Sequence, residues 1–186
     1  LTPEKLIVSV AVDFSLRQVE SLCRARAARA IPSVASGKGL GVTLLVLGSG
    51  ASEDDRSLVF RLFGSIGWPV EVAEEQLEVL SDLTSSGPAY ISAILREFAL
   101  EASMQDGKVD RDLAEQLIKK TLIGTAALLE DESFDDLIAM VATRGGITEE
   151  GAKVIEALSP EMFRQLFSAT SAKHRLVKDR IGNVEE

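Results

Sequence analysis

The sequence predicts a partial α/β domain followed by an all-helical domain. Residues 6–12, Leu-Ile-Val-Ser-Val-Ala-Val, form a nearly continuous β-branched and apolar run. Such a run is typical of a strand covered on both faces, and therefore of a parallel sheet. Beyond Glu74 no strand pattern remains, and amphipathic helical periods follow one another to the end of the chain. We therefore predict an α/β part over residues 1–73 and a helical part over residues 74–186.

Strands and helices alternate in the first part. After the strand at 6–12, short strands are predicted at 29–32, 42–47 and 69–72 from their apolar and β-branched residues. Ser15 is a suitable cap for a short helix ending near Leu22, and a second helix begins at Ser52 or Glu53. This alternation is the pattern of α/β architecture.

The second part reads as a succession of helices. The first begins at Gly87-Pro88, where proline is tolerated because first-turn N–H groups lack intrahelical partners, and Gly107 ends it. Asp110 is a suitable cap for the second, residues 134–141 form a shorter third, and Ser159-Pro160 begins the last. Each carries an apolar stripe at helical spacing. Two interpretations of these stripes stay open, namely packing within one subunit and a helix-mediated dimer.

Composition excludes several classes of protein. A net charge of −9 and a pI near 4.8 disfavour nucleic acid and anionic membrane surfaces as partners. One cysteine and one histidine allow neither an internal disulfide nor a His/Cys zinc site, so no metal is predicted. The longest apolar run, residues 42–47, is far shorter than the roughly 20 residues of a membrane span. We expect a cytoplasmic protein and, because the chain begins Leu1-Thr2-Pro3, the interior of a longer one.

Residues 143–151, Thr-Arg-Gly-Gly-Ile-Thr-Glu-Glu-Gly, are the strongest candidate for a binding site. Gly145 and Gly146 allow backbone conformations closed to other residues, and Thr148 is a suitable cap for a helix starting at Glu149. Free N–H groups at such a helix start suit a ligand carboxylate. The alternative interpretation is an ordinary Gly-Gly turn with a threonine cap.

A second motif, Ser85-Ser86-Gly87-Pro88-Ala89-Tyr90, precedes this loop by about fifty residues. Together, the two segments resemble the signature segments of the pyrroline-5-carboxylate reductase family, which reduces a cyclic imine to proline with a nicotinamide cofactor. The resemblance implies a Rossmann-like parallel sheet, here lacking its N-terminal βαβ unit, and a helical dimerisation domain. It also implies NADPH or NADH as cofactor, an imino-acid substrate and a homodimer.

The resemblance also implies roles for particular residues. The strand places Val10, Ala11 and Val12 beside the cofactor, and Arg29-Ala30-Ile31-Pro32-Ser33 matches a motif that adds Pro32 and Ser33 to that site. In the substrate loop, the N–H groups of Gly146, Ile147 and Thr148 would bind the carboxylate. Thr148 would also donate a hydrogen bond to the substrate as the catalytic residue, with Thr143 on the other side of the loop.

The sequence also departs from the family pattern. It has no glycine-rich G-x-G-x-x-G turn after a strand, so the cofactor would be bound mainly by residues absent from this chain, and the chain alone is expected to be inactive. Arg144 replaces a proline, and Glu149 and Glu150 follow Thr148 where neutral residues are usual. The segment Ile31-Pro32-Ser33 and the loop at residues 145–151, Gly-Gly-Ile-Thr-Glu-Glu-Gly, are similar to the divergent late-competence ComER-type branch. A non-biosynthetic paralogue and a non-catalytic dimerisation module are the alternatives.

Overall fold

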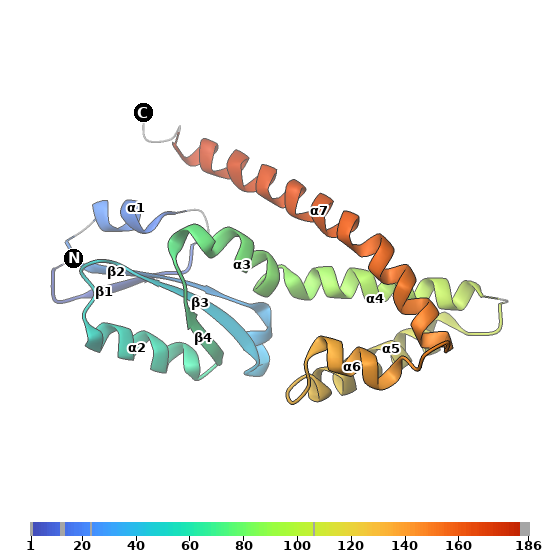
Figure 1. Ribbon diagram of the computed structural model, residues 1–186. Helices are drawn as coiled ribbons and strands as arrows, with labels where there is room; N and C mark the ends of the chain where they lie inside the picture. The colour runs from blue at the N-terminus through green and yellow to red at the C-terminus, as the bar shows by residue number, and fades with distance from the viewer. Residues whose placement is uncertain (1, 12–13, 23, 106, 183–186) are drawn as a thin grey trace. The chain divides into compact units, whose positions relative to one another are not determined.

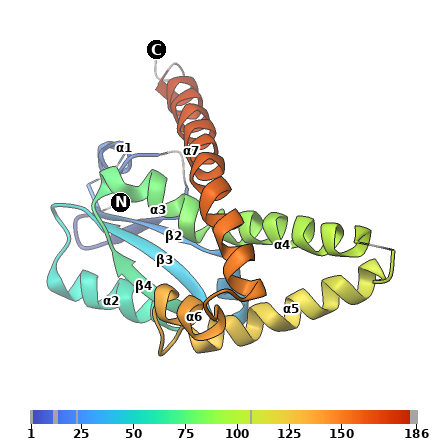
Figure 2. The ribbon, with the colours of Figure 1, turned by 45° about the vertical axis from the view of Figure 1, so that its right-hand side comes forward.

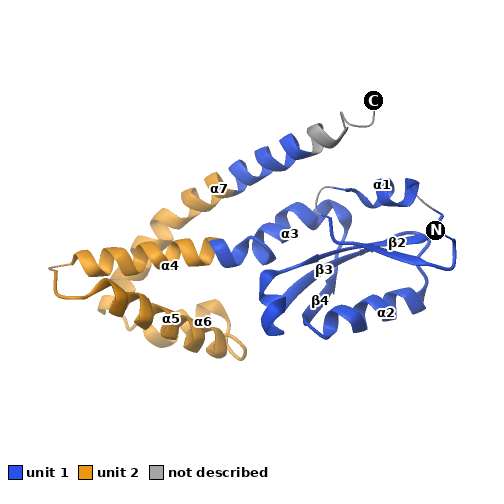
Figure 3. Ribbon diagram, turned by 180° about the vertical axis from the view of Figure 1, so that it is seen from behind, with its two compact units in different colours: residues 1–89, 167–186 blue, residues 90–166 orange. Residues whose placement is uncertain are grey.

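The structure is a computed structural model of the 186-residue chain and describes residues 2–11, 14–22, 24–105 and 107–182. The first part of the chain contains four strands, and the rest is helical. Figure 1 shows this order of strands and helices along the chain. The chain forms two compact units, one of Leu1–Ala89 with Phe167–Glu186 and one of Tyr90–Leu166 (Figure 3). As predicted, no strand follows the fourth one in the described residues. The predicted domain boundary between residues 73 and 74 stays a prediction.

The first unit contains a four-stranded sheet in the order β1-β2-β3-β4. Its strands are β1 (Leu6–Ser9), β2 (Arg26–Pro32), β3 (Gly41–Leu47) and β4 (Gly67–Glu71). All four predicted strands exist, although β1 ends three residues before the predicted limit at Val12, a residue outside the described ranges. The register pairs Ser9 with Arg29 and Ile31 with Leu44.

The sheet is mixed and not wholly parallel, which corrects the sequence-based prediction. β1 pairs with β2 and β3 with β4 in parallel, whereas β2 and β3 are antiparallel. The reason lies in the connections. A helix separates each parallel pair, namely α1 (Leu16–Ser21) and α2 (Glu53–Gly64), but only the short 3₁₀ helix η1 (Val34–Lys38) separates β2 from β3. So short a connection allows an antiparallel pair, because a parallel crossover needs a dozen or more residues.

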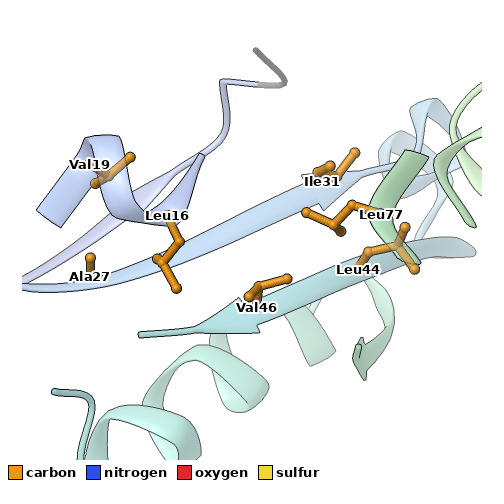
Figure 4. Packing of buried hydrophobic residues seen from close by; sticks show 7 residues of the cluster. All are labelled: Leu16, Val19, Ala27, Ile31, Leu44, Val46 and Leu77. Atoms are coloured by element: carbon orange, nitrogen blue, oxygen red, sulfur yellow. The ribbon is translucent and has the colours of Figure 1, made fainter. Parts of the chain in front are cut away.

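Helices cover both faces of this sheet, which creates two apolar cores. On one face α1 and α3 (Leu77–Thr84) contribute Leu16, Val19 and Leu77, which pack on Ile31 and Leu44 (Figure 4). On the other face α2 packs on β2 and β3 through a second cluster. Its buried members are Ala30, Leu45, Val59 and Phe63. The central strands β2 and β3 are thus covered on both faces. The sequence predicted this for residues 6–12, whose strand β1 is half-buried, with Ile7 packed against one core and Leu6 and Val8 against the other.

Thr43 lies in β3 with a fully buried side chain, and its hydroxyl has no hydrogen-bond partner among the described residues. Burying an unpaired hydroxyl costs about 1–3 kcal/mol in proteins. We therefore expect Thr43→Val to raise the free energy of unfolding by about 1 kcal/mol, measured as a higher urea midpoint. Thr43→Ser, which keeps the hydroxyl and loses the methyl group, should lower it. A lower midpoint for the valine variant would show that a buried water satisfies the hydroxyl.

An ion pair between the buried Arg29 and the half-buried Glu74 connects β2 to the segment that leads into the helices. Glu74, in the 3₁₀ helix η2 (Glu74–Gln76), accepts from Arg29 Nη1 at 2.7 Å and from the backbone N–H of Leu16 at 2.6 Å. Arg29 is only 6% exposed, so its charge needs this carboxylate. One glutamate therefore fixes the start of α1, the middle of the sheet and the entry to α3.

The capping box of α2 shows how local sequence sets a helix start. Asp55 accepts from both the backbone N–H and the hydroxyl of Ser52, each at 2.8 Å. These hydrogen bonds, with the nearby Arg26 guanidinium, hold the pKa of the Asp55 carboxyl below its ordinary value. The predicted helix start at Ser52 or Glu53 is confirmed.

The second unit is built from α4 (Gly87–Met104), α5 (Arg111–Leu128), α6 (Phe134–Val141) and the first part of α7 (Ile147–Gly182). The predicted stop at Gly107 and cap at Asp110 are confirmed, since Gly107 has a φ of 60° and Asp110 accepts from Leu113 N–H at 3.2 Å. From that turn α5 runs back beside α6 (Figure 2). These helices share few contacts with one another and leave most of their apolar side chains exposed.

The predicted helix start at Ser159-Pro160 is wrong. Helix α7 is continuous from Ile147 to Gly182, with Pro160 inside it. Proline lacks an N–H and therefore removes one backbone hydrogen bond from this helix, but the flanking turns continue through it. The helical spacing of apolar and polar residues continues before and after Pro160, and it outweighs the local preference of Ser159-Pro160 for a helix start.

Candidate functional site

The loop between α6 and α7 is a tight turn that requires both of its glycines. Gly145 has a φ of 73°, in the left-handed region that other residues rarely adopt. Gly146 donates its N–H to the carbonyl oxygen of Thr143 at 2.8 Å, which closes the turn. A Cβ on Gly146 would lie 2.6 Å from Thr143 Oγ1 and 2.8 Å from Thr143 O, so a larger residue would open it.

Helix α7 begins two residues earlier than the predicted start at Glu149. It starts at Ile147, and the carbonyl of Gly146 accepts from Glu150 N–H at 3.3 Å. Thr148 therefore lies in the first turn and is not the cap, which corrects the prediction. The Thr148 side chain is exposed, and Ile147 is 94% exposed.

The start of α7 offers backbone donors, although fewer than the sequence predicted. The N–H of Gly146 is already paired with Thr143, so in this conformation it is not offered to a ligand. The N–H groups of Ile147 and Thr148 have no intrahelical acceptor, because the first turn of any helix lacks one. The positive end of the helix dipole lies at the same place. These two N–H groups can therefore donate hydrogen bonds to an anion or a carbonyl oxygen.

The sequence did not predict the hydrogen bond between Glu149 and Gly145 in this loop. Its Oε2 accepts from the N–H of Gly145 at 2.5 Å, so the side chain folds back over the turn. The other oxygen, Oε1, lies 3.7 Å from Lys153 Nζ, and Lys153 makes a shorter contact of 2.7 Å with Glu150 Oε1. A carboxylate of the chain itself is thus held at the turn. A glutamate four residues after a glycine is the only sequence signal for this contact, and many helices share it.

The residues predicted to contact a cofactor lie in the first unit, at one edge of the sheet. β1 and β2 are parallel, so Val10 and Ala11, which follow β1, lie at the same edge as Pro32 and Ser33 at the end of β2. Val12 lies outside the described residues. Val10 is 60% exposed, and Ala11 is also exposed, with its N–H donating to Ser9 Oγ at 3.3 Å. In open α/β sheets, ligands bind beyond the carboxyl ends of the strands.

Part of a nicotinamide cofactor fits the residues at this edge. Val10, Ala11 and the half-buried Pro32 form an apolar strand end that a flat ring can contact. Ser33 is less available, because its side chain is buried and its hydroxyl accepts from Ala35 N–H at 3.4 Å as the cap of η1. The sequence provides no glycine-rich turn for a pyrophosphate. The chain's residues therefore fit the ring end of a dinucleotide and not its phosphates.

The predicted substrate-binding residues lie together in one loop, and the described cofactor-binding residues lie together at one end of the sheet. The two groups belong to different units of the chain. Thr143, Gly146, Ile147 and Thr148 belong to the second unit, whereas the residues at the ends of β1 and β2 belong to the first. In the described part of the chain, no three His, Cys, Asp or Glu side chains are placed to hold a metal ion. Within those ranges no helix has both the length and the apolar character needed to cross a bilayer.

A four-stranded α/β sheet, followed by helices that leave most of their apolar side chains exposed, defines a protein with an α/β part and a helical part. The model of the family described as pyrroline-5-carboxylate reductase dimerisation matches residues 74–176. The chain belongs to the pyrroline-5-carboxylate reductase family.

Individual relatives support this assignment over nearly the whole chain. Pyrroline-5-carboxylate reductase 3 of Bacillus subtilis (strain 168) is 34% identical over 95% of this chain and 65% of its own length. ComE operon protein 4 of the same organism is 28% identical over 94% of the chain and 64% of its own length. The chain thus spans less than two thirds of the length of these relatives. The chain is therefore similar both to a named pyrroline-5-carboxylate reductase and to a protein of the ComE operon.

Solved structures show the same fold. A pyrroline-5-carboxylate reductase from Coxiella burnetii has a TM-score of 0.80 and 31% identity, covering 94% of this chain and 65% of that one. The Plasmodium falciparum pyrroline carboxylate reductase, solved with NADP bound, has a TM-score of 0.76 at 20% identity, covering 95% and 70%. The predicted fold class, a partial α/β sheet followed by a helical dimerisation domain, is confirmed.

Proposed function

We propose that this chain is the substrate-binding and dimerisation part of an NAD(P)H-dependent reductase that converts pyrroline-5-carboxylate to proline. The observation that supports it most is the glycine turn at the start of α7 within a chain of this family. The turn directs the N–H groups of Ile147 and Thr148 out of the helix, where a carboxylate can accept from both. We infer a homodimer in the cytoplasm as its working form.

The role of the protein in this reaction is mainly to hold two reactants in contact. When bound, NADPH or NADH supplies the hydride that reduces the C=N bond, and its nicotinamide ring is oxidised. The N–H groups of Ile147 and Thr148 would hold the substrate carboxylate, and the Thr148 hydroxyl would donate to the substrate. Val10, Ala11 and Pro32 would present the apolar surface against which the nicotinamide lies, and Thr143 would border the substrate.

The test is the initial rate of NADPH oxidation with pyrroline-5-carboxylate, measured with the full-length parent protein. Thr148→Val removes the hydroxyl but keeps the branched shape and the backbone N–H, and we expect kcat/KM to fall at least tenfold. Thr148→Ser, which keeps a hydroxyl, should retain most of the rate. Equal rates for the wild type and the valine variant would remove Thr148 from the reaction.

A second candidate is a reductase-like paralogue that does not make proline. It is favoured by Glu149, whose carboxylate already occupies the turn, and by the similarity to ComE operon protein 4. A folded protein that binds NADPH but does not oxidise it with pyrroline-5-carboxylate would support this candidate. A purely structural dimerisation module would bind neither compound.

A further inference from the structure

We propose that Glu149 is a specificity-determining residue, which weakens the hold of the loop at 143–148 on a ligand carboxylate. The loop then prefers pyrroline-5-carboxylate less strongly over a cyclic imine that has no carboxylate. This inference rests on the proposed function, because it concerns the ligand of the same loop. Its physical basis is the position of one charged side chain.

The Glu149 carboxylate is fixed at the turn by two contacts. Oε2 accepts from Gly145 N–H at 2.5 Å, and Oε1 lies 3.7 Å from Lys153 Nζ. The side chain is only 33% exposed, so it is held and not freely solvated. A side chain from the first turn that reaches back to Gly145 must lie beside the end of the helix.

A ligand carboxylate bound to the N–H groups of Ile147 and Thr148 would share that helix end with Glu149. Two negative charges at one helix terminus compete for the same positive dipole and repel each other. Lys153 offsets this repulsion only in part, because its shorter contact, 2.7 Å, is with Glu150. The repulsion acts on carboxylates and not on a ring that lacks one. Glu149 therefore lowers selectivity without closing the site.

Glu150 provides a matched control one position along the same helix. It carries the same charge, but its side chain is 70% exposed and its described contact is with Lys153. Because solvent and salt screen exposed charges, its effect on a ligand at the turn should be small. Any effect of total charge would appear equally in both variants, whereas an effect of position would appear only at Glu149.

The test compares Glu149→Gln and Glu150→Gln with the wild type, using L-proline and pyrrolidine as probes with and without a carboxylate. Titrations followed by amide NMR give both dissociation constants. We expect Glu149→Gln to raise the affinity for L-proline relative to pyrrolidine at least tenfold, and Glu150→Gln to change this ratio less than twofold. The gain should shrink as salt is added. The Gly145 amide resonance should shift in Glu149→Gln and stay in place in Glu150→Gln.

The outcomes separate this inference from the proposed function. If the wild type and Glu149→Gln both bind L-proline with an unchanged ratio, the inference is wrong and the function stands. An unmoved Gly145 resonance in Glu149→Gln also overturns the inference, because the contact would then be absent in solution. If neither protein binds L-proline at all, the carboxylate site itself is absent, and the proposed function fails together with the inference.

Discussion

Gly67→Ala is expected to destabilise the sheet unit by about 3 kcal/mol or more, enough to unfold a protein of ordinary stability in part. Gly67 begins β4 with a φ of 148°, a conformation that is essentially restricted to glycine. A Cβ built there would collide with the backbone carbonyl oxygen of Gly41, its partner in β3. Backbone atoms of a paired strand cannot move aside as a flexible side chain can, so the β3–β4 pair must separate. The measurement is the urea midpoint of unfolding by circular dichroism.

Gly64→Ala is the matched control for this prediction. Gly64 is the last residue of α2, and its nearest neighbour to a new Cβ is Pro69 Cγ at 4.0 Å, an ordinary contact. Alanine favours the helix over glycine by up to about 1 kcal/mol, so this variant should be as stable as the wild type or more so. If the two alanine variants unfolded at the same urea concentration, the close approach of Gly67 to Gly41 would be absent in solution.

The contrast between these two glycines shows what the sequence could predict of the fold. Apolar and β-branched runs predicted all four strands, because a strand that is covered by helices needs apolar side chains on its covered faces. The constraint on Gly67 arises from its pairing with Gly41, 26 positions away by numbering, and no local pattern contains it. The antiparallel β2–β3 pair follows from the short connection through η1, which is too short for a parallel crossover.

For the candidate site, the sequence predicted the glycine turn but not the Glu149 side chain that folds back onto it. Two adjacent glycines marked the loop, and the left-handed Gly145 and the crowded Gly146 explain both of them. The rotamer by which Glu149 reaches Gly145 is a choice among several that a helix permits, so it required a structure. Thr148 was predicted as a cap because threonine favours that position, but the turn closed by Thr143 and Gly146 lets the helix start two residues earlier, at Ile147.

The helical unit leads to the second large prediction, that the chain associates through it and that Phe98→Asp strongly weakens this association. Phe98 on α4 is 62% exposed, Leu117 on α5 57% and Ile155 on α7 67%. In contrast, the hydrophobic residues buried in this unit, within the described ranges, are Ala99 and Ala114. Fixing a residue's backbone costs about 1–2 kcal/mol, and two buried alanines cannot offset that cost over residues 90–166. A second copy of the chain is the partner for which the family model is described.

The size of the effect follows from what the interface would bury. A Phe or Leu side chain contributes about 1.5–3 kcal/mol when it is fully buried, and an unpaired carboxylate in its place adds a desolvation penalty. In a twofold symmetric dimer each substitution occurs twice. We therefore expect Phe98→Asp to raise the dimer dissociation constant more than 100-fold, which sedimentation equilibrium at micromolar concentration measures. Phe98→Leu, which keeps an apolar side chain of similar size, should leave the protein dimeric.

Helix content distinguishes two explanations of a dissociated variant. If the helices depend on the partner for burial, dissociation of Phe98→Asp should also reduce the helical circular dichroism signal, and wild-type stability should rise with protein concentration. If the variant stayed fully helical as a monomer, α4 to α7 would have to bury their apolar faces against one another. A wild-type monomer that keeps its helices at micromolar concentration would contradict the prediction outright, because those exposed side chains would then have no partner to cover them.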